Sequence, residues 1–325
     1  IELSYKNYGE PFHYSFQQIG YLIFSVFACS FFLFLSSENL KKNYKVFLLF
    51  FLFLLVLVVI PDIGKTVNNS TRWLSYGGLN IQPSEFFKLF YVIWLCAYLD
   101  YNKKNIHKFE IFIMPILCFF ISAILLLKQP DFGSTAVIFL MTFVMLFIAR
   151  AKIFHLMTLF FSGAIGASIL IYLSPERLSR FNLIEPCSDY LGDGYHLCWS
   201  LMAIGSGGIF GKGLGASTTK LSYLYGAHTD FIFAILAEEL GIFGVVFTII
   251  LFYLFIKKCF FVGDKALRVG LIFQGYLSYA IGIFITLQAF LSMAVTLGIA
   301  PTKGLAMPFF SYGGSNYLVS ILSIT

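Results

Sequence analysis

Charged residues are scarce in this sequence. Only 12% of its 325 residues are Asp, Glu, Lys or Arg, whereas 59% are hydrophobic and 40 are phenylalanines. Soluble domains are about 25% charged and about 45–50% apolar, so this composition excludes an ordinary soluble protein. The apolar runs are long rather than alternating, which favours membrane-spanning helices over the strands of a membrane barrel. We therefore expect an all-α, polytopic integral membrane bundle.

Cysteine is also sparse, and its spacing indicates no structural metal. The chain has six cysteines and lacks both the Cys-x-x-Cys and the His-x-x-x-His spacing. Four cysteines lie in or beside apolar runs, where thiols act as small hydrophobic groups: Cys29, Cys96, Cys118 and Cys259. Cys187 and Cys198 share one long loop and could pair in an oxidising compartment. Two cysteines in one loop are more often free, and we favour that interpretation.

Nine apolar segments are long enough, or nearly so, to form transmembrane helices, which need about 17–25 residues. Eight of them lie at residues 18–35, 46–60, 84–99, 109–127, 134–149, 154–173, 231–256 and 269–297. A ninth segment begins near Phe309 and is cut off at Thr325. The long stretch between the sixth and seventh segments, residues 174–230, is predicted to be a large loop within one transmembrane domain that covers residues 1–325.

Basic residues predict the orientation of these spans. One set of alternate loops carries twelve of them: Lys41, Lys42, Lys45, Lys103, Lys104, Lys108, Arg150, Lys152, Lys257, Lys258, Lys265 and Arg268. The other set of short loops carries four: Lys65, Arg72, Lys128 and Lys303. The positive-inside rule puts the basic-rich set in the cytoplasm, so residues 1–17 and the large loop face outside. A chain with a cytoplasmic start would need another span before Ile1, and position 1 is not Met. We therefore expect a fragment that lacks its first span.

The large outer loop brings one carboxylate, Asp230, to the start of the seventh apolar segment. In isolation, an Asp at this place is most simply a helix cap that accepts hydrogen bonds from free N–H groups. A catalytic role becomes the alternative because other polar residues gather at the outer ends of the spans. We interpret His228 as a hydrogen-bonding loop residue and Glu238 and Glu239 as structural.

Two more polar groups lie at outer helix ends. Glu85 and Lys88 are three residues apart near the start of the third segment, close enough to pair. They are either a helix start with a snorkelling lysine or part of a polar cavity. Each charge inside a membrane costs roughly 2.5–3.5 kcal/mol, so two together favour the cavity. Asp131 either shapes the turn before the fifth segment or adds a carboxylate to the same cavity.

Glycines crowd one part of the large loop, at positions 205, 207, 208, 211, 213 and 215. They look like a phosphate-binding loop but fail the Gly-x-x-x-x-Gly-Lys-Ser/Thr pattern at two places, because Gly205 lies one residue too early and Gly213 replaces the Ser or Thr required after Lys212. We expect a compact, bendable outer loop that binds no nucleotide. Its backbone N–H groups remain candidates for contact with a diphosphate.

These segments together resemble the SEDS family of bacterial cell-wall proteins, the group containing FtsW, RodA and SpoVE. The resemblance spans nearly the whole chain in the family's order. It is carried by Arg72-Trp73, Gln82-Pro83-Ser84-Glu85, Gln129-Pro130-Asp131-Phe132-Gly133, the segments 200–208 and 228–233, Glu238-Glu239-Leu240-Gly241 and Ser311-Tyr312-Gly313-Gly314-Ser315. Residues 301–305 and Ala227 are more similar to the division branch, FtsW, than to the elongation branch. The chain departs from the usual pattern at Tyr225-Gly226, His196 and Trp199.

The resemblance implies a ten-span helical bundle, of which this chain holds about nine spans. It implies peptidoglycan glycosyltransfer, in which lipid II is polymerised into glycan strands at the outer face of the cytoplasmic (inner) membrane, at the septum during cell division. Asp230 corresponds to the family's catalytic aspartate. The implied substrate-binding or cavity residues are Arg72, Glu85, Lys88, Asp131, Lys303 and Ser311.

The resemblance also implies partners and a cofactor. The partners are lipid II, the growing glycan strand, a class B penicillin-binding protein and other divisome membrane proteins, with no nucleic acid. A divalent cation, Mg²⁺ or Mn²⁺, is expected for the diphosphate leaving group, although the sequence shows no ligand set. Two other functions stay open, a lipid II flippase and a non-catalytic divisome scaffold. No internal repeat with broken helices is recognisable, which argues against a transporter.

Overall fold

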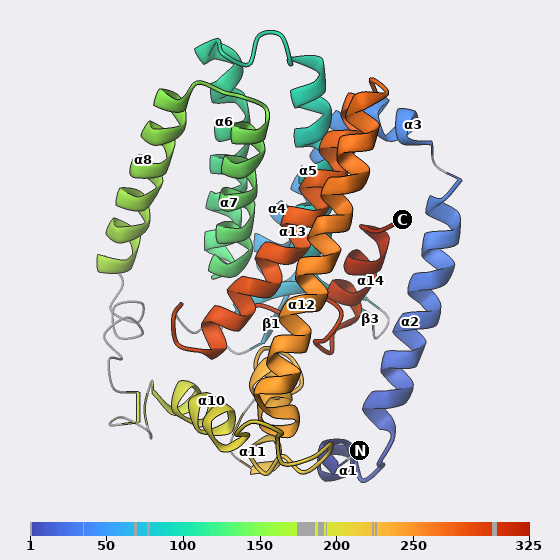
Figure 1. Cartoon of the computed structure of the whole chain (residues 1–325), viewed down its shortest axis with the longest axis vertical. Helices are drawn as coiled ribbons and strands as arrows, with labels where there is room; N and C mark the ends of the chain where they lie inside the picture. Colours follow the sequence, from blue (N-terminus) through green and yellow to red (C-terminus); the bar gives the residue numbers. More distant parts are fainter. Residues whose placement is uncertain are drawn as a thin grey trace. The chain divides into compact units, whose positions relative to one another are not determined.

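The computed structural model describes residues 2–34, 36–67, 70–76, 79–173, 186–187, 192, 194–222, 224, 226–300 and 304–325. Within these residues the chain is almost entirely helical (Figure 1). It divides into two compact units. Unit 1 consists of Ile1–Phe24, Gly163–Leu254 and Gln288–Tyr317, and unit 2 of Ser25–Ser162, Phe255–Leu287 and Leu318–Thr325.

Each predicted span contains a helix. In chain order these are α2 (His13–Phe32), α4 (Tyr44–Val59), α5 (Pro83–Tyr101), α6 (Phe109–Lys128), α7 (Phe132–Ile148), α8 (Ile153–Tyr172), α12 (Ile232–Arg268), α13 (Ile272–Thr296) and α14 (Gly314–Leu322). The shorter helices are α1 (Glu2–Tyr8), α3 (Ser37–Lys42), α10 (Tyr195–Ser206) and α11 (Thr219–Ser222). By length and composition α2, α6, α12 and α13 can each cross a membrane, and α4, α7 and part of α8 are shorter apolar helices. The prediction of a polytopic helical membrane bundle is confirmed.

A small antiparallel sheet follows α4. The sequence had not predicted this sheet. Its strands are β1 (Gly64–Val67), β2 (Ser70–Tyr76) and β3 (Leu79–Ile81), in the order β1-β2-β3. Lys65 pairs with Trp73, and Leu74 with Ile81. The strands are short and rich in β-branched and aromatic residues, which favour strands. Cross-strand pairing satisfies their backbone N–H and C=O groups, which are not part of a helix. The sheet places Arg72 on its central strand.

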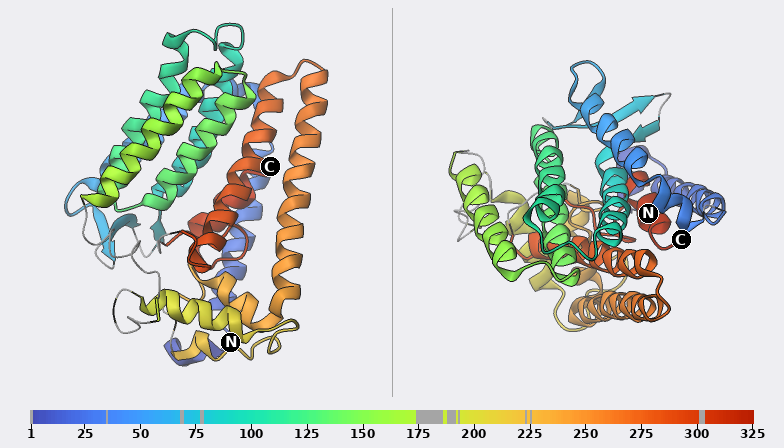
Figure 2. Two further views of the ribbon diagram at one scale, coloured as in Figure 1. Left: turned by 60° about the vertical axis from the view of Figure 1, so that its left-hand side comes forward. Right: turned by 90° about the horizontal axis from the view of Figure 1, so that it is seen from above.

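Helix α5 forms the buried centre of unit 2. It is apolar on most of its circumference and almost all of its residues are buried, as expected for a helix enclosed by neighbours. The hydroxyl of Tyr91 lies 2.9 Å from the hydroxyl of Thr142 on α7 and donates to the carbonyl of Pro115 on α6, at 3.3 Å. Helices α6 and α7 lie side by side (Figure 2). This enclosure takes the polar start of α5 into the protein interior.

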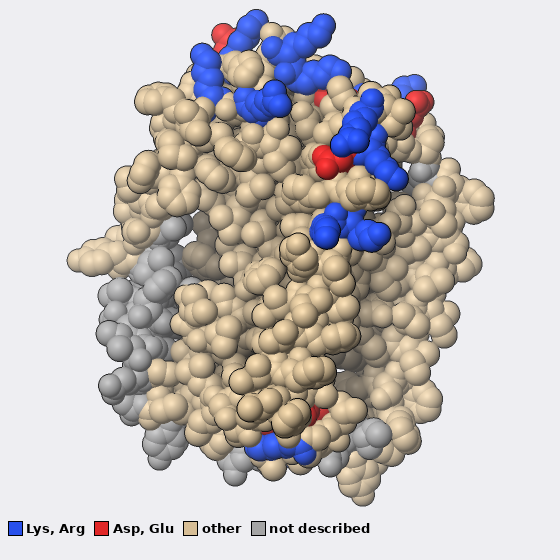
Figure 3. Space-filling view, in the orientation of Figure 1, with Lys and Arg blue, Asp and Glu red and all other residues tan. Residues whose placement is uncertain are grey.

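The end of α12 and the start of α13 form an antiparallel pair in unit 2 (Figure 2). A Cβ atom at Gly263 would lie 2.5 Å from the ring of Tyr279, and one at Gly282 would lie 2.7 Å from Cβ of Cys259. Small residues at such positions let two membrane helices approach closely. Lys and Arg side chains gather at the end of unit 2 that holds the loops between α5 and α6, between α7 and α8, and between α12 and α13 (Figure 3).

Unit 1 contains the described part of the large loop. Helix α10 packs on the turn before α12 through a buried cluster: Ala203, Leu224, Ala227, Phe231, Ala234 and Ile235. Cys187 and Cys198 form a disulfide with their Cα atoms 5.0 Å apart, so the interpretation of two free thiols is wrong. The bond ties the start of α10 to the loop that precedes it. Residues 174–185, 188–191, 193, 223 and 225 of the predicted loop lie outside the described residues.

Candidate active site

Asp230 lies in a tight turn just before α12. The N–H groups of Thr229 and Phe231 both donate to the carbonyl of Gly226, at 3.0 and 3.2 Å. Gly226 has φ of +75°, in the left-handed region that favours glycine. The carbonyl of Phe231 accepts from the N–H of Ile235, so Phe231 takes the N-cap position and Asp230 precedes it. The turn therefore presents the half-buried Asp230 beside the helix start rather than at the cap.

A second segment of unit 1, residues 304–313, passes directly beside this carboxylate. A Cβ atom added at Gly304 would lie only 2.5 Å from Oδ2 of Asp230. The buried hydroxyl of Ser311 donates to the carbonyl of Thr229 at 2.7 Å and accepts from the N–H of Met307, also at 2.7 Å. Ser311, a predicted site residue, thus holds the backbone next to Asp230 in place.

His228 belongs to an aromatic cluster. Its ring centroid lies 4.9 Å from that of Tyr14 and 5.7 Å from that of Tyr312, and these two tyrosines make an edge contact at 5.1 Å. Nδ1 of His228 is buried and has no hydrogen-bond partner among the described residues. Burial lowers the pKa of His228 below its ordinary value of 6.5. The ring packs as an aromatic group. The carbonyl of His228 accepts from the N–H of Tyr312 at 2.9 Å, so the predicted hydrogen bonding in the loop is made through the backbone.

The glycine-rich segment inserts into a break in α12. Gly241 has φ of +66° inside the helix, so the regular i to i−4 ladder is interrupted there. The carbonyls of Glu238 and Glu239 accept instead from the N–H groups of Lys212 and Gly213, both at 3.0 Å. In return, the N–H groups just after the break donate to the carbonyls of residues 208 and 209, at 3.0 and 3.2 Å. The loop thus completes the hydrogen bonding of a broken membrane helix.

Close backbone approach explains two of these glycines. A Cβ atom at Gly211 would lie 2.1 Å from the carbonyl oxygen of Glu239, and one at Gly207 would lie 2.1 Å from that of Ala237. The N–H groups of Lys212 and Gly213 already have partners on α12, so they are not free to bind a diphosphate. Contact of a diphosphate with other N–H groups of the loop stays a prediction, whereas the expected compact loop is observed.

Side chains fasten the same loop. Nζ of Lys212 lies 2.7 Å from Oε1 of the fully buried Glu238, whose other oxygen accepts from the hydroxyl of Ser217 at 2.5 Å. Lys220 pairs with Glu239 at 2.8 Å. Both glutamates therefore hold the loop that leads to Asp230, in agreement with the structural role predicted for them.

In unit 2, Glu85 and Lys88 form a buried ion pair. Oε1 of Glu85 lies 2.8 Å from Nζ of Lys88, and the two residues are 4% and 1% exposed. The predicted pairing is confirmed. Lys88 Nζ also lies 5.7 Å from the ring centroid of Phe284 on α13. Oε2 of Glu85 is buried with no hydrogen-bond partner in the described part of the chain.

Asp131 and Arg72 are linked through the turn before α7. Asp131 is 2% exposed and caps α7, accepting from the N–H of Ser134 at 3.1 Å, while its Oδ2 has no partner among the described residues. Arg72 donates to the backbone carbonyls of Gln129 and Pro130 at 3.2 and 2.5 Å. Arg72 therefore fixes the turn that carries Asp131. Both sequence-based interpretations of Asp131, as a turn residue and as a buried carboxylate, describe part of what is observed.

The predicted site residues are thus distributed over the two units. Asp230 and Ser311 belong to unit 1, whereas Arg72, Glu85, Lys88 and Asp131 belong to unit 2. Lys303 lies outside the described residues. The described residues contain no group of three or more His, Cys, Asp or Glu side chains that could hold a metal ion. That all of these residues line one cavity stays a prediction.

The apolar helices define a multi-pass membrane protein, and each of its two units carries polar groups at helix ends. The chain belongs to the FtsW/RodA/SpoVE family, whose model, described as "Cell cycle protein", matches residues 1–325. The family resemblance inferred from the motifs is therefore confirmed.

Named relatives and solved structures agree with this assignment. The chain is 38% identical to the "Probable peptidoglycan glycosyltransferase FtsW" of Thioalkalivibrio sulfidiphilus, covering 100% of this chain and 82% of the relative. It is 39% identical to the protein of the same name from Coxiella burnetii, covering 99% and 87%. Thermus thermophilus "Rod shape determining protein RodA" superposes with a TM-score of 0.69 at 25% identity, covering 99% and 88%.

A further solved chain is similar in fold. It comes from a study of "Structural coordination of polymerization and crosslinking by a peptidoglycan synthase complex" and superposes with a TM-score of 0.80 at 25% identity. The alignment covers 97% of this chain and 88% of that one. The similar chain thus belongs to an assembly that polymerises and crosslinks peptidoglycan.

Proposed function

We propose that this chain is a peptidoglycan glycosyltransferase that polymerises lipid II into glycan strands, with Asp230 as the general base. The family, and the names of relatives aligned over 97% or more of the chain, support the enzyme class. The observation that carries the assignment of the base is the carboxylate of Asp230, fixed against Gly304 in a turn that Ser311 holds. The glycine leaves space for the carboxylate.

The reaction needs one base on the acceptor side. The 4-hydroxyl of the acceptor sugar attacks the anomeric carbon of the donor, forming the new C–O bond as the bond to the diphosphate oxygen breaks. Asp230 takes the proton of that hydroxyl, and the electron pair of the broken bond leaves with undecaprenyl diphosphate. Going from an α-diphosphate to a β-linkage inverts the carbon in one displacement, so the second carboxylate of a glycosidase is not required. Aspartates are ordinarily ionised at neutral pH and can accept this proton.

Positive groups stabilise the departing diphosphate in this proposal. Lys88, Arg72 and Lys303 are the candidates. Lys88 is paired with Glu85, and two N–H groups of Arg72 bind backbone carbonyls. A divalent cation, Mg²⁺ or Mn²⁺, is part of the proposal, since Oε2 of Glu85 and Oδ2 of Asp131 are buried oxygens without a described partner. Mg²⁺ is often held by only one or two carboxylates together with substrate phosphates. When bound, it would neutralise charge on the diphosphate.

The setting of the reaction is also proposed. The alternation of basic loops supports a cytoplasmic membrane protein with Asp230 on the outer side. The names of the relatives support a role in septal wall synthesis. The solved complex supports a crosslinking partner, which we propose is a class B penicillin-binding protein. Other divisome membrane proteins are proposed as partners from the family resemblance.

The test of the base is Asp230→Asn, which keeps the size of the side chain and removes its basicity. The purified chain and its penicillin-binding partner would be given lipid II in detergent, and the glycan strands separated on a gel. We expect wild type to make strands and Asp230→Asn to lose about 10²–10⁴-fold in rate, the usual contribution of general base catalysis. Asp62→Asn, an exposed Asp outside the site, is the matched control.

Other outcomes separate the competing functions. Strand synthesis by Asp230→Asn at the wild-type rate would exclude Asp230 as the base. Absence of strands with the wild-type chain would favour the flippase or the scaffold, because neither function polymerises lipid II.

A further inference from the structure

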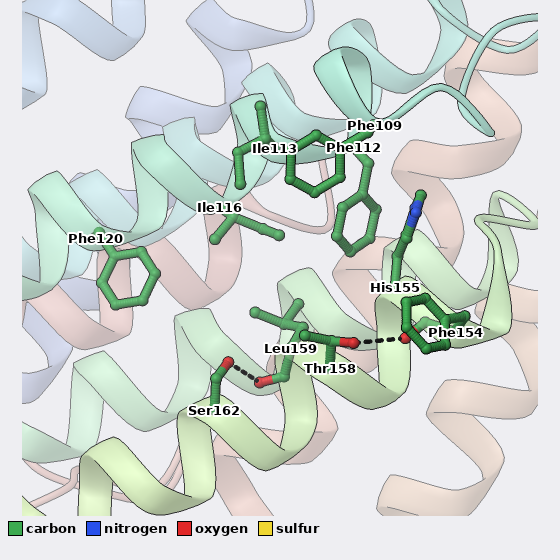
Figure 4. A pocket seen from close by; sticks show the side chains of 10 residues that line it. All are labelled: Phe109, Phe112, Ile113, Ile116, Phe120, Phe154, His155, Thr158, Leu159 and Ser162. Carbon is green, nitrogen blue, oxygen red and sulfur yellow. Dashed lines mark hydrogen bonds between the residues drawn. The ribbon is translucent and has the colours of Figure 1, made fainter.

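Unit 2 contains a cavity that is lined by none of the site residues described above. Its volume is about 350 Å³, and it lies between the first part of α6 and the first part of α8 (Figure 4). Ten side chains line it: Phe109, Phe112, Ile113, Ile116, Phe120, Phe154, His155, Thr158, Leu159 and Ser162. None of them belongs to the site residues assigned above. Small-molecule sites usually measure about 300–1,000 Å³, so the space is large enough to hold part of a ligand.

The wall of this cavity is mostly apolar, and its two hydroxyl groups already have hydrogen-bond acceptors. The hydroxyls of Thr158 and Ser162 donate to carbonyls of their own helix, at 3.0 and 3.1 Å, so they do not need a ligand to satisfy them (Figure 4). The ring of His155 contacts the rings of Phe109 and Phe112, at 5.6 and 5.0 Å between centroids. Nδ1 of His155 is buried without a hydrogen-bond partner in the described part of the chain, so the wall offers a ligand one polar atom. The rest of the wall would not replace the hydrogen bonds that a polar ligand makes with water, so the cavity suits a hydrocarbon chain.

The length of the cavity matches one leaflet of a membrane. On α6 the lining runs from Phe109 to Phe120, which at 1.5 Å per residue is roughly 17 Å. On α8 it runs from Phe154 to Ser162, or roughly 12 Å by the same rise. Half of a hydrocarbon core of about 30 Å is about 15 Å. The cavity therefore accommodates an acyl chain from one leaflet.

Positive charge surrounds the end where α6 and α8 begin. Lys108 directly precedes α6, and Lys152 directly precedes α8; both side chains are exposed. Further exposed basic residues on the same two loops are Lys103, Lys104 and Arg150. Glu110, in the first turn of α6, is the opposing charge. Figure 3 shows Lys and Arg gathered at this end.

The N-termini of α6 and α8 add to the positive electrostatic potential of these basic residues. No side chain caps α6 at Lys108, so N–H groups of its first turn are available to an anion. The starts of α6 and α8 each carry the positive end of a helix dipole. An acyl chain in the cavity would place its headgroup beside these two starts and the lysines that precede them.

We propose that this cavity binds an anionic phospholipid, with one acyl chain between α6 and α8 and the headgroup phosphate at Lys108 and Lys152. Basic pockets between membrane helices are known to select anionic lipid headgroups in this way. The site requires no contact with lipid II, so it can be tested apart from glycan synthesis.

The test uses the full chain purified in detergent. Dioleoyl phosphatidylglycerol or dioleoyl phosphatidylcholine would be added, and retained lipid measured by native mass spectrometry. We expect phosphatidylglycerol to be retained about tenfold more than phosphatidylcholine, which has the same chains and no net charge, in line with charge selection. The double variant Lys108→Gln/Lys152→Gln should lose this preference. Lys42→Gln/Lys45→Gln, exposed lysines of unit 2 outside the cavity, should keep it.

A second pair of variants tests the chain-binding part. Thr158→Trp places a large side chain in the cavity and should reduce retention of phosphatidylglycerol to background. Ile121→Trp, at an exposed position of α6 that does not line the cavity, should leave it unchanged. Because position 158 is exposed, the substitution should not disturb the core.

Three results would overturn the proposal. One is a wild-type chain that retains the two phospholipids equally, or that retains neither of them. Another is unchanged retention in both Lys108→Gln/Lys152→Gln and Thr158→Trp. The third is displacement of phosphatidylglycerol by an equimolar amount of undecaprenyl phosphate, which would assign the cavity to an isoprenoid carrier.

Discussion

The carboxylate of Asp230 depends on a residue that has no side chain. Oδ2 would lie 2.5 Å from a Cβ atom at Gly304, closer than non-bonded atoms approach. Any larger residue at 304 must therefore displace either the carboxylate or the segment 304–313. Since Ser311 and Tyr312 anchor that segment to residues 228 and 229, the carboxylate is the easier part to move.

We therefore predict that Gly304→Ala slows strand synthesis without unfolding the chain. A base displaced by about 1 Å can cost about 10²-fold in rate, so the expected loss is about 10- to 100-fold in kcat. The matched control is Gly313→Ala, because a Cβ atom there meets nothing within 4 Å. Equal rates for the two variants would show that the contact with Gly304 does not position Asp230.

His228 gives the fold a pH dependence. Burial lowers its pKa in the folded chain, so the unfolded chain binds this proton more readily. Stability is therefore lost as the pH falls below about 6.5, the ordinary histidine pKa, toward the lower folded-state pKa. We predict that Tm in detergent falls over this range, and that His228→Phe shows a smaller fall. His107→Phe, at an exposed histidine, should match wild type; identical curves for all three chains would contradict the prediction.

Residue contacts within one helix could be predicted from the sequence, whereas distant ones could not. The pairing of Glu85 with Lys88 follows from a spacing of three on a helix. Arg72 contacts the carbonyl of Gln129, 57 residues away, and Gly304 contacts Asp230 across α12 and α13. No local pattern encodes such contacts, because they depend on how the elements pack. The aromatic packing of His228 was missed for the same reason.

At the scale of elements, α12 is interrupted, and the glycine-rich loop supplies the hydrogen bonds that the interrupted helix lacks. Its composition predicts one apolar span, which is correct, but Gly241 interrupts it. Open carbonyls within a membrane helix are costly, and the hydrogen bonds from Lys212 and Gly213 remove that cost. The glycines of residues 205–215 suggested a phosphate loop because that motif and this insertion both need close backbone approach. The spacing before Lys212 excluded a nucleotide-binding loop, but nothing in the sequence predicted the insertion into α12.

We predict that Gly241→Ala releases the inserted loop. A Cβ atom at 241 would lie 2.4 Å from the backbone N of Gly211, and φ of +66° adds strain for any residue with a Cβ. Limited proteolysis should cut within residues 207–222 at least several-fold faster than in wild type. Gly205→Ala in α10 is the control, because nothing lies within 4 Å of its added Cβ. Equal cleavage of all three chains would contradict the insertion.

The sheet and the disulfide show which elements the sequence leaves undecided. Strands of three to seven residues are too short to show a clear alternation of apolar and polar residues, so β1, β2 and β3 were not predicted. Pairing of Cys187 with Cys198 depends on the path of the loop between them, which spacing does not determine. The nine helical segments were predictable because each needs a long apolar run.

At the scale of the whole molecule, charge and redox chemistry agree on orientation. By the positive-inside rule the twelve Lys and Arg residues of the basic-rich set lie on the cytoplasmic side, whereas the disulfide and Asp230 belong to the large loop that the rule puts outside. Disulfides persist in oxidising compartments and are rare in the cytosol. The disulfide therefore supports, independently of the basic residues, an outer location for the large loop.

We predict that the loop around Asp230 faces outside and that residues 257–268 face the cytoplasm; these residues were expected to form a loop but are the last part of α12. Alkaline phosphatase folds only in an oxidising compartment, so a fusion after Gly215 should be active and one after Gly263 inactive. Thiol labelling provides a second measurement. The Cys187→Ser variant should expose Cys198 to a thiol reagent after denaturation without reductant, whereas in wild type Cys198 should react only once reductant is added. An active fusion after Gly263 together with an inactive one after Gly215 would reverse the orientation, and it would place the proposed base on the side of the membrane where glycan strands are not built.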